Sequence, residues 1–360
     1  MYINNELYKK DIKKVIVEDF SLFKNKSILI TGASGLVGSA IVDILMFLNE
    51  KFNYSIDIYG TFSREKTFEN RFQSYKNNPH FHPVIQDITN AFDYDFSVDY
   101  IIHAASNTHP HLYGTKPVET IKLNILGTLN VLDFAKKNKN SKSLFLSTLE
   151  VYGSKDNIEV FEENNIGFVD FMKPRACYPE SKRTCETLCH SYIQEYEMNI
   201  NIARLGYIYG PTVKMDSTKA DVQFLAKALN NENIVMKSAG LQKRSYLYVL
   251  DTAAALLTIL LKGENGETYN VAAKSGNVLL RDYAKHLAHI ANVEIIFENA
   301  TEQEKKGFST VANSTLDGEK IKSLGWSEKF IFEEAIENTF KIKKEIECLK
   351  SWKSKFLKLI

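Results

Sequence analysis

The 360-residue chain lacks the features that mark several classes of protein. Its cysteines are Cys177, Cys185, Cys189 and Cys348, and no two of them form a CxxC pair, so we expect neither a zinc site nor a disulfide framework. Its 45 basic and 44 acidic residues leave a net charge of +1, which gives no indication of a nucleic-acid partner. No apolar run approaches the roughly 20 residues needed to cross a membrane, and the N-terminus has no apolar signal core. We therefore expect a cytoplasmic protein without a resident metal.

The chain instead alternates short apolar runs with helical patterns. Six runs predict buried strands, at residues 27–32, 55–62, 81–87, 98–106, 142–148 and 199–210. Helical patterns lie between them, most clearly at 117–138 and 180–196. Buried strands that alternate with helices predict an α/β fold with a doubly wound parallel sheet, as in Rossmann domains.

This alternation weakens after residue 210, which predicts a second domain. We assign 26–210 and about 250–274, with a further strand at 267–273, to the Rossmann domain. A smaller, mixed C-terminal domain for the substrate would take up 211–249 and 275–345. Residues 1–25 predict a helical N-terminal extension, and 346–360 predict an amphipathic basic tail.

The segment ILITGASGLVGSAIV places Gly32, Gly35 and Gly38 between the first strand and the following helix. Glycine at these positions permits a tight turn and lets the backbone approach a pyrophosphate, while the helix N-terminus offers free N–H groups. The GxxGxxG spacing therefore favours a bound dinucleotide. The alternative is a tight strand-to-helix turn with nothing bound.

The choice between NAD and NADP depends on the end of the second strand, YGTFSRE. An acidic residue there would accept the ribose hydroxyls, but Ser63 and Arg64 occupy the place and Asp57 lies too early. Arg64 would hold a 2′-phosphate, or it begins the next helix in solvent. Asp87 ends the third strand, where it would accept a bond from the adenine amino group or cap a turn. Both alternatives stay open on the sequence.

Tyr178 and Lys182 lie four residues apart at the start of a predicted helix, in CYPESKR. That spacing puts both side chains on one face of the helix. An ammonium group beside a phenol favours the phenolate and lowers its pKa, so Tyr178 could take a proton from a substrate hydroxyl near neutral pH. Thr148, at the end of the fifth strand, could hydrogen-bond the same oxygen. The alternative is a chance YxxxK pair, which the glycine turn upstream disfavours.

Together these motifs resemble a known family. TGxxGxxG, HAAS, STLEVYG and YxxxK are similar to those of the extended short-chain dehydrogenase/reductases that modify nucleotide sugars. The resemblance covers roughly residues 26–345 and is strongest to UDP-glucuronate decarboxylases and their epimerase and dehydratase relatives. Three segments carry this closer match, namely ASNTHPHLYGTKPVETIKLNILGTLNVL, PRACYPESKRTCETLC and GLQKRSYLYVLD.

The resemblance implies a tightly bound NAD, with NADP as an open alternative, and a C-terminal domain that holds a nucleotide diphosphate sugar. It also implies a homodimer through paired helices, here those near 117–138 and 180–196. The catalytic residues that it implies are Thr148, Glu150, Tyr178 and Lys182. Those that would bind the cofactor are Gly32, Gly35, Leu36, Val37, Gly38, Ser63, Arg64, Asp87, Ile88, Ala104, Ala105, Ser106, Asn124, Tyr178 and Lys182. Those that would bind the substrate are Tyr113, Ser147, Thr148, Arg204, Lys219, Gln223 and Arg244.

The fate of a 4-keto sugar would decide the reaction. Tyr178 would take the proton from O4 while C4 gives hydride to the nicotinamide. If C5 carries a carboxylate, the intermediate can lose CO₂, which is decarboxylation. If hydride returns to the other face, C4 is inverted, which is epimerisation. If an acid and a base act at C6 and C5, water is eliminated, which is dehydration. Dehydratases carry Thr-Asp-Glu at the fifth strand, and leucine cannot donate a proton, so Leu149 disfavours dehydration. Plain 4-epimerases usually lack the glutamate, so Glu150 favours decarboxylation unless it is a mere surface carboxylate.

Several positions depart from the decarboxylase pattern. Decarboxylases carry Thr-Ser-Glu where this chain has Leu149, and their DGRVVxNF segment is STKADVQF here, with Lys219 and Gln223 in place of arginine and asparagine. The sugar or the base could therefore differ from those of UDP-glucuronate. Arg244, in LQKR, would bind the diphosphate or stabilise a carboxylate. The remaining two candidates, His109 and His111, would border the sugar or lie in solvent.

The C-terminal segment 341–360 is basic and amphipathic. Among its seven lysines, apolar residues recur at helical spacing, at Ile346, Leu349, Trp352, Phe356 and Ile360. Such a helix would lie on a membrane surface, dock a partner enzyme, or pack on its own domain. We favour packing on its own domain.

The sequence thus predicts an NAD-dependent enzyme of polysaccharide biosynthesis that decarboxylates a nucleotide-linked uronic acid such as UDP-glucuronate. C4 epimerisation is the first alternative and 4,6-dehydration the second. A non-catalytic dinucleotide sensor on the same fold is the alternative from another class. The Tyr178–Lys182 pair argues against it, because a sensor needs no tuned phenol.

Overall fold

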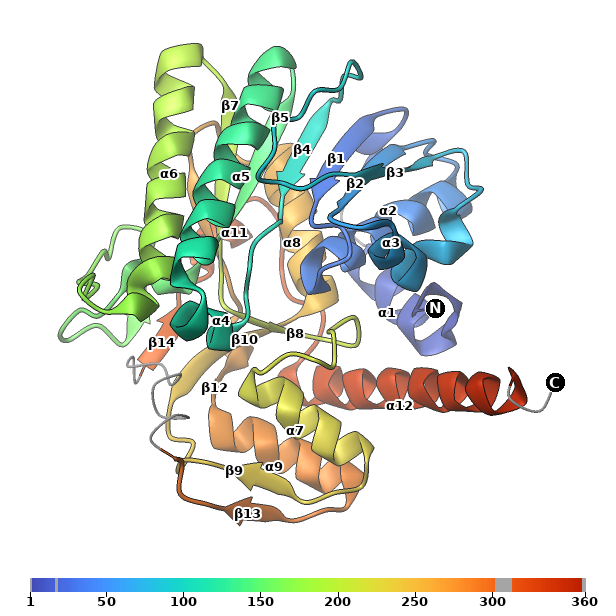
Figure 1. The fold of residues 1–360 in the computed structure, drawn as a ribbon, viewed down its shortest axis with the longest axis vertical. Coiled ribbons are helices and arrows are strands. Elements are labelled where there is room, and N and C mark those ends of the chain that lie inside the picture. Colours follow the sequence, from blue (N-terminus) through green and yellow to red (C-terminus); the bar gives the residue numbers. More distant parts are fainter. Residues whose placement is uncertain (1, 17–18, 302–312, 358–360) are drawn as a thin grey trace.

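A parallel sheet forms the centre of the computed structural model, which describes residues 2–16, 19–301 and 313–357, without the side chains of 313 and 350–357 (Figure 1). Its seven strands follow the order β3-β2-β1-β4-β5-β7-β11, which confirms the doubly wound fold. They are β1 (Ser27–Thr31), β2 (Asp57–Phe62), β3 (Phe81–Ile85), β4 (Tyr100–His103), β5 (Lys142–Thr148), β7 (Asn199–Leu205) and β11 (Thr268–Val271). The chain leaves the centre in both directions, so the topological switch point lies between β1 and β4.

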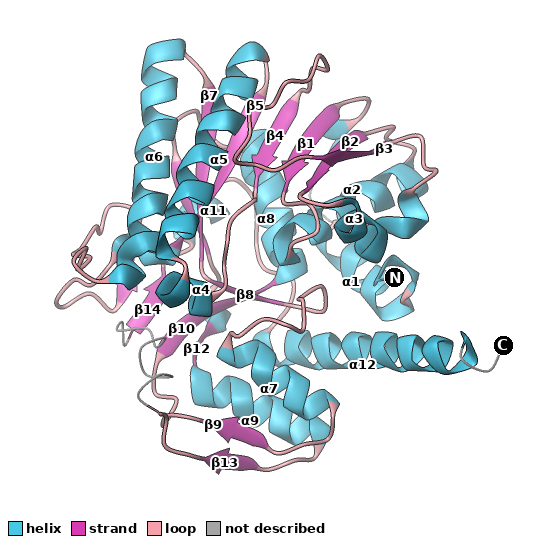
Figure 2. Cartoon of the chain, in the orientation of Figure 1, coloured by secondary structure: helices cyan, strands magenta, loops and turns pink. Residues whose placement is uncertain are grey.

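Helices cover both faces of this sheet (Figure 2). One face carries α2 (Leu36–Phe52) and α8 (Val249–Lys262), and the other carries α5 (Pro117–Lys137) and α6 (Cys177–Tyr196). Successive strand residues point to opposite faces, so Ile28 and Ile30 join the core under α2 and α8, while Leu29 joins the core under α5 and α6. Burial on both faces explains why the strands are continuous apolar runs rather than alternating ones.

A second, mixed sheet lies beside the carboxyl ends of the central strands (Figure 1). Its strands are β12 (Asn277–Leu279), β10 (Lys243–Tyr248), β14 (Asn313–Leu316), β6 (Val160–Phe161) and β8 (Tyr207–Tyr209). A further pair, β9 (Ile234–Met236) with β13 (Ile295–Phe297), lies next to α7 (Ala220–Leu229) and α9 (Leu280–Ala291). A short helix, α11 (Glu319–Lys322), precedes the C-terminal helix α12 (Phe332–Leu357).

One predicted strand is wrong in its extent. The run 199–210 forms two strands, because β7 pairs with β5 and β11 while β8 leaves the central sheet to pair with β10. Gly206 separates them, and a Cβ at this position would lie 2.5 Å from the carbonyl oxygen of Ser245 on β10. The close approach of β10 therefore bends the chain from one sheet into the other. Two strands within 26–210, β6 and β8, thus belong to the second sheet.

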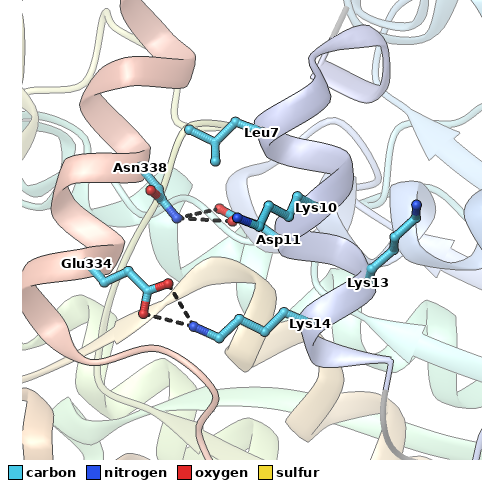
Figure 3. Close-up of a pocket in the computed structure, with 7 residues that line it drawn as sticks. All are labelled: Leu7, Lys10, Asp11, Lys13, Lys14, Glu334 and Asn338. Carbon is cyan, nitrogen blue, oxygen red and sulfur yellow. Dashed lines mark hydrogen bonds and ion pairs between the residues drawn. The ribbon is translucent and has the colours of Figure 1, made fainter.

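The N-terminal helix α1 (Glu6–Val15) packs against α12 (Figure 3). The Asn338 amide donates to the Asp11 carboxylate, and Lys14 forms an ion pair with Glu334 at 2.7 Å. Helix α12 continues through position 346 without a break, and Ile346 is buried. Among the other predicted tail residues, Leu349 is exposed, whereas the side chains of Trp352, Phe356 and Ile360 lie outside the described residues. In the part of the chain that is described, every helix is too short or too polar to pass through a bilayer.

Candidate active site

The glycine turn follows β1 at the switch point of the sheet. Gly32 has φ +65°, which is the left-handed region that favours glycine, and a Cβ there would lie 2.8 Å from Ala105 Cα. A Cβ at Gly38 would lie 2.6 Å from the carbonyl oxygen of Gly32. Both positions therefore need glycine for the turn itself, whether or not a ligand binds.

The same turn fits a dinucleotide. Gly35 is the N-cap of α2 and no side chain caps the helix, so the backbone N–H groups of its first turn, at Leu36, Val37 and Gly38, are available to an anion. A helix N-terminus at the switch point of a doubly wound sheet is where a pyrophosphate binds. The residues present thus fit the predicted cofactor.

Two neighbouring groups of predicted cofactor residues are held by hydrogen bonds, one to the end of β1 and the other to α6. The N–H groups of Ala104 and Ala105 donate to Thr31 Oγ1, each at 3.1 Å, which joins the end of β4 to the end of β1. The Ser106 hydroxyl donates to Asn124 at 2.8 Å, and the Asn124 amide donates to the Ser181 hydroxyl on α6 at 2.8 Å.

The remaining cofactor candidates lie at the ends of β2 and β3. Ser63 and Arg64 are exposed, and Arg64 takes the N-cap position of α3 (Glu65–Phe72). Asp87 accepts bonds from the Thr89 N–H and hydroxyl at 2.9 and 2.8 Å, the turn arrangement considered as its alternative role. Ile88 packs in the core under α5.

Tyr178, the predicted catalytic tyrosine, stacks on a second tyrosine, Tyr113. Tyr178 lies in the first turn of α6, and Tyr113 lies on α4 (Pro110–Thr115). Their ring centroids are 4.6 Å apart with an interplanar angle of 11°, and both rings are buried. Thr148, at the end of β5, lies within hydrogen-bonding reach of the Tyr178 phenol. Three predicted site residues are thereby brought together.

The structure does not show the expected lowering of the Tyr178 pKa by Lys182. Burial raises the pKa of Tyr178 above its ordinary value, and the nearby charge of Glu150 raises it further, against the hydrogen bonds of Thr148 and Tyr113. Lys182 instead donates to the Leu146 carbonyl at 2.8 Å. Burial lowers the pKa of Lys182 itself, because the charged amine has lost its water.

Glu150 pairs with an arginine that the sequence reasoning did not single out. It lies in the 3-10 turn η4 (Leu149–Tyr152), directly after Thr148. Arg175 lies in η5 (Pro174–Ala176), just before α6, and its two terminal nitrogens donate to the two Glu150 oxygens at 2.7 and 3.2 Å. The one feature of the sequence that could have identified Arg175 is its position three residues before the tyrosine of YxxxK.

Leu149 faces away from this ion pair. It is buried in an apolar cluster with Val151, Tyr152, Phe161, Ala272 and Leu316. The leucine position is therefore a packing position here, and it presents no acid to a substrate.

Ser147 and Arg204, both predicted to bind substrate, instead contact a buried glutamate, Glu186. The Ser147 hydroxyl donates to a Glu186 carboxylate oxygen, and Arg204 pairs with the other Glu186 oxygen at 2.7 Å. Arg204 also donates to the carbonyl of Glu163 at 2.7 Å. Glu186 lies on α6 and was not identified from the sequence. It forms a buried cluster with Ser147 of β5 and Arg204 of β7.

The other predicted substrate residues lie on β10 of the second sheet, at the start of α7 and on α4. Arg244, on β10, lies over the Tyr207 ring at 4.4 Å and donates to the Tyr246 hydroxyl at 3.4 Å. Lys219 is the N-cap of α7, and Gln223 is exposed on its first turn. His109 is the N-cap of α4, and His111 is exposed on the same helix. Within residues 2–16, 19–301 and 313–349, no three His, Cys, Asp or Glu side chains cluster as metal ligands.

A model of the NAD dependent epimerase/dehydratase family matches residues 28–272 of the sequence. The chain belongs to this family. It is therefore an enzyme of this class, and its cofactor is NAD. UDP-glucuronic acid decarboxylase 3 of Arabidopsis thaliana is 32% identical over 316 residues, which make up 87% of either protein. This similarity confirms the resemblance found in the motifs.

Solved structures of the family share the fold. The dTDP-glucose 4,6-dehydratase of Streptomyces venezuelae, with NAD and TYD bound, superposes with a TM-score of 0.77 at 22% identity over 89% of this chain and 97% of that one. The UDP-glucuronic acid 4-epimerase of Bacillus cereus, in complex with UDP-glucuronic acid and NAD, has a TM-score of 0.74 at 22% identity over 89% and 99%.

Proposed function

We propose that this protein decarboxylates a nucleotide-linked uronic acid such as UDP-glucuronate through a transient 4-keto intermediate. The observation that carries the proposal is the position of Glu150, two residues after Thr148 and close enough to Tyr178 to raise its pKa. The decarboxylase named above, similar over 87% of the chain, supports the same reaction.

The first step would place the sugar O4 between Thr148 and Tyr178. NAD, when bound at the glycine turn, would accept hydride from C4 and later return it. Thr148 would hold O4 by a hydrogen bond, and the Tyr178 phenolate would accept the O4 proton. Tyr113, stacked on Tyr178, keeps water from one face of the phenol.

The second step breaks the bond between C5 and the carboxyl carbon. A 4-keto uronic acid is a β-keto acid, so CO₂ leaves and the electron pair moves onto O4. The protonated Tyr178 would then return its proton to O4. A proton from water would add to C5 while O4 returns its proton to the Tyr178 phenolate, which restores the ketone. Return of the hydride to C4 and of the Tyr178 proton to O4 would then give a pentose.

Arg244, on β10, would hold the nucleotide end of the substrate. Lys219, the N-cap of α7, and Gln223, in its first turn, would bind the same end. Ser147 and Arg204 would act on substrate indirectly, because Glu186 holds both of them. Arg64 and Asp87 would face the adenosine part of the cofactor from the ends of β2 and β3.

C4 epimerisation is the second candidate, because the fold is shared with a UDP-glucuronic acid 4-epimerase. Dehydration is disfavoured, since Leu149 is buried in an apolar cluster and supplies no acid. We also propose a cytoplasmic homodimer that serves polysaccharide biosynthesis, paired through α5 and α6. Val118, Ile121 and Leu126 of α5 are exposed apolar side chains that such pairing would cover.

The test is to incubate the NAD-loaded protein with UDP-glucuronate and, as the matched neutral sugar, with UDP-glucose. The expected result is loss of CO₂ from the uronate alone, read by mass spectrometry and proton NMR. An isomer of unchanged mass would establish epimerisation instead, and loss of water would establish dehydration. No turnover of a broad panel by protein that binds NAD would favour a sensor.

A further inference from the structure

The Glu150–Arg175 ion pair joins the two segments that carry the catalytic side chains. Glu150 follows Thr148 at the end of β5, and Arg175 precedes Tyr178 at the start of α6. The two parallel bonds, at 2.7 and 3.2 Å, form the fork geometry that fixes both groups in orientation. The side chains are 24% and 26% exposed, so water screens the pair only in part.

This ion pair also borders the stacked tyrosines. The Arg175 guanidinium carbon lies 5.6 Å from the centroid of the Tyr113 ring, which in turn stacks on Tyr178. The two partners act on the phenols with opposite sign, because the charge of Glu150 raises the pKa of both tyrosines and that of Arg175 lowers it. An unpaired carboxylate at position 150 would therefore oppose formation of the Tyr178 phenolate.

Two neighbouring cations of α6, Lys182 and Arg183, bind elsewhere and do not take over this role. Lys182 donates to the Leu146 carbonyl, away from Glu150. Arg183, further along α6, donates to the carbonyls of Val151 and Gly167, each at 2.7 Å. It also ties α6 to η4, but its charge is not among the largest influences on the Tyr178 pKa.

We propose that Arg175 is a positioning residue of this active site, which fixes Glu150 beside the Tyr113–Tyr178 stack and offsets its negative charge there. The inference deepens the proposed function, since it explains how one site holds both a carboxylate and a tyrosine that must ionise. It predicts that removal of Arg175 raises the Tyr178 pKa through the unpaired Glu150, and that further removal of Glu150 reverses this rise.

Cys177 offers a readout that needs no substrate. Its buried thiol lies beside Tyr178, and burial raises its pKa, while the charge of Arg175 lowers it and that of Glu150 raises it. The thiolate is the form that reacts with iodoacetamide, so the alkylation rate of Cys177 reports the local charge balance. Peptide mass spectrometry separates this cysteine from Cys348, which is exposed.

The first experiment compares Cys177 alkylation in the NAD-loaded wild type, Arg175→Met, Glu150→Gln, the double variant and the control Arg183→Met. We expect Arg175→Met to slow the reaction roughly three- to tenfold and Glu150→Gln to speed it by a similar factor. The double variant should return close to the wild-type rate. If the substitutions only loosened the segment around Cys177, alkylation would be faster in every variant. Faster alkylation in Arg175→Met would therefore overturn the proposal.

The second experiment measures the pH dependence of kcat for whichever nucleotide sugar is turned over. A higher Tyr178 pKa moves the rising limb to higher pH, so Arg175→Met should shift it upward by roughly one unit, and Glu150→Gln downward. Arg175→Lys, which keeps the charge and loses the fork, should keep the limb and lower kcat. Unchanged limbs in all variants would refute the proposal. Absence of CO₂ release would refute the proposed reaction and leave the alkylation result standing.

Discussion

Tyr113 and Tyr178 form a stacked pair, with ring centroids 4.6 Å apart and planes 11° from parallel. They come from different elements, α4 and α6, and the Tyr113 hydroxyl is fixed by donation to the Asn107 carbonyl at 3.2 Å. Both rings of the stack are buried. Stacking leaves the Tyr178 ring in place when the hydroxyl is removed, which permits a clean test of the hydroxyl alone.

Tyr178→Phe should abolish turnover without unfolding the protein. The ring would still stack on Tyr113, while the hydroxyl that is proposed to move the O4 proton is lost. We expect kcat to fall by about 10² to 10⁴, the range for loss of a general base. The measurement is turnover of UDP-glucuronate together with the melting temperature. A variant that folds and keeps more than a tenth of wild-type kcat would contradict the role of Tyr178.

The glycine turn gives a second prediction. Gly38→Ala would place a Cβ 2.6 Å from the Gly32 carbonyl oxygen and so displace the first turn of α2 from its position. We expect NAD to bind roughly tenfold or more weakly, a cost of about 1.4 kcal/mol, measured by titration calorimetry. Gly114→Ala is the matched control, because a Cβ at that position meets no atom within 4 Å. Equal NAD affinity in both variants would show that the turn does not bind the cofactor.

The parts of the molecule that sequence predicts are those set by local spacing. Strand runs such as 27–32 are recognisable because both faces are buried, and Tyr178 and Lys182 share a helix face because they are four residues apart. The contacts of these residues depend on distant segments. The Lys182 amine reaches the Leu146 carbonyl, the ring stacked on Tyr178 comes from α4, and the charge that raises its pKa comes from Glu150 in η4, none of which a local pattern reports.

The site residues that the sequence missed belong to pairs between separate elements. Arg175 and Glu150 meet across 25 residues, and Glu186 meets Arg204 from a helix against a strand. Nothing in either local segment indicates the partner. The division of 199–210 at Gly206 likewise depends on the passage of β10, which is distant in sequence.

The Arg204–Glu186 pair yields a prediction on stability. Both side chains are 8% exposed, so Arg204→Met would leave Glu186 buried and unpaired, at a cost of about 3 kcal/mol or more in the free energy of unfolding. The double variant Arg204→Met/Glu186→Leu should recover much of that loss. Lys227→Met is the control, since the pair of Lys227 with Glu232 is half exposed and a solvated surface pair contributes little to stability. Urea unfolding gives these values. Wild-type stability in Arg204→Met, with a raised KM, would instead assign Arg204 to direct substrate binding.

A buried carboxylate makes stability depend on pH in an unusual direction. Asp251, on α8, accepts the N–H groups of Lys329 and Phe330 at 2.8 and 3.2 Å and so anchors the segment that leads into α12. Burial raises its pKa to about 7, against the two backbone bonds. Because the folded pKa lies above the unfolded one, the folded state binds the extra proton, and this stabilisation is fully present below the unfolded pKa. It is lost as the pH rises through about 7.

Asp251→Asn should remove this dependence, because the amide keeps an acceptor oxygen and carries no charge. The free energy of unfolding of the variant minus that of the wild type should increase as the pH rises from about 4 to about 7, by an amount on the order of a few kcal/mol, and then level off. Asp99→Asn is the control of opposite sign. Burial raises the Asp99 pKa, but hydrogen bonds from Lys26 and Ser27 outweigh burial and lower the pKa overall. The Asp99→Asn variant should therefore lose stability relative to the wild type as the pH rises. A difference for Asp251→Asn that stays flat across this range in urea unfolding would show that Asp251 is already ionised in the folded protein at low pH.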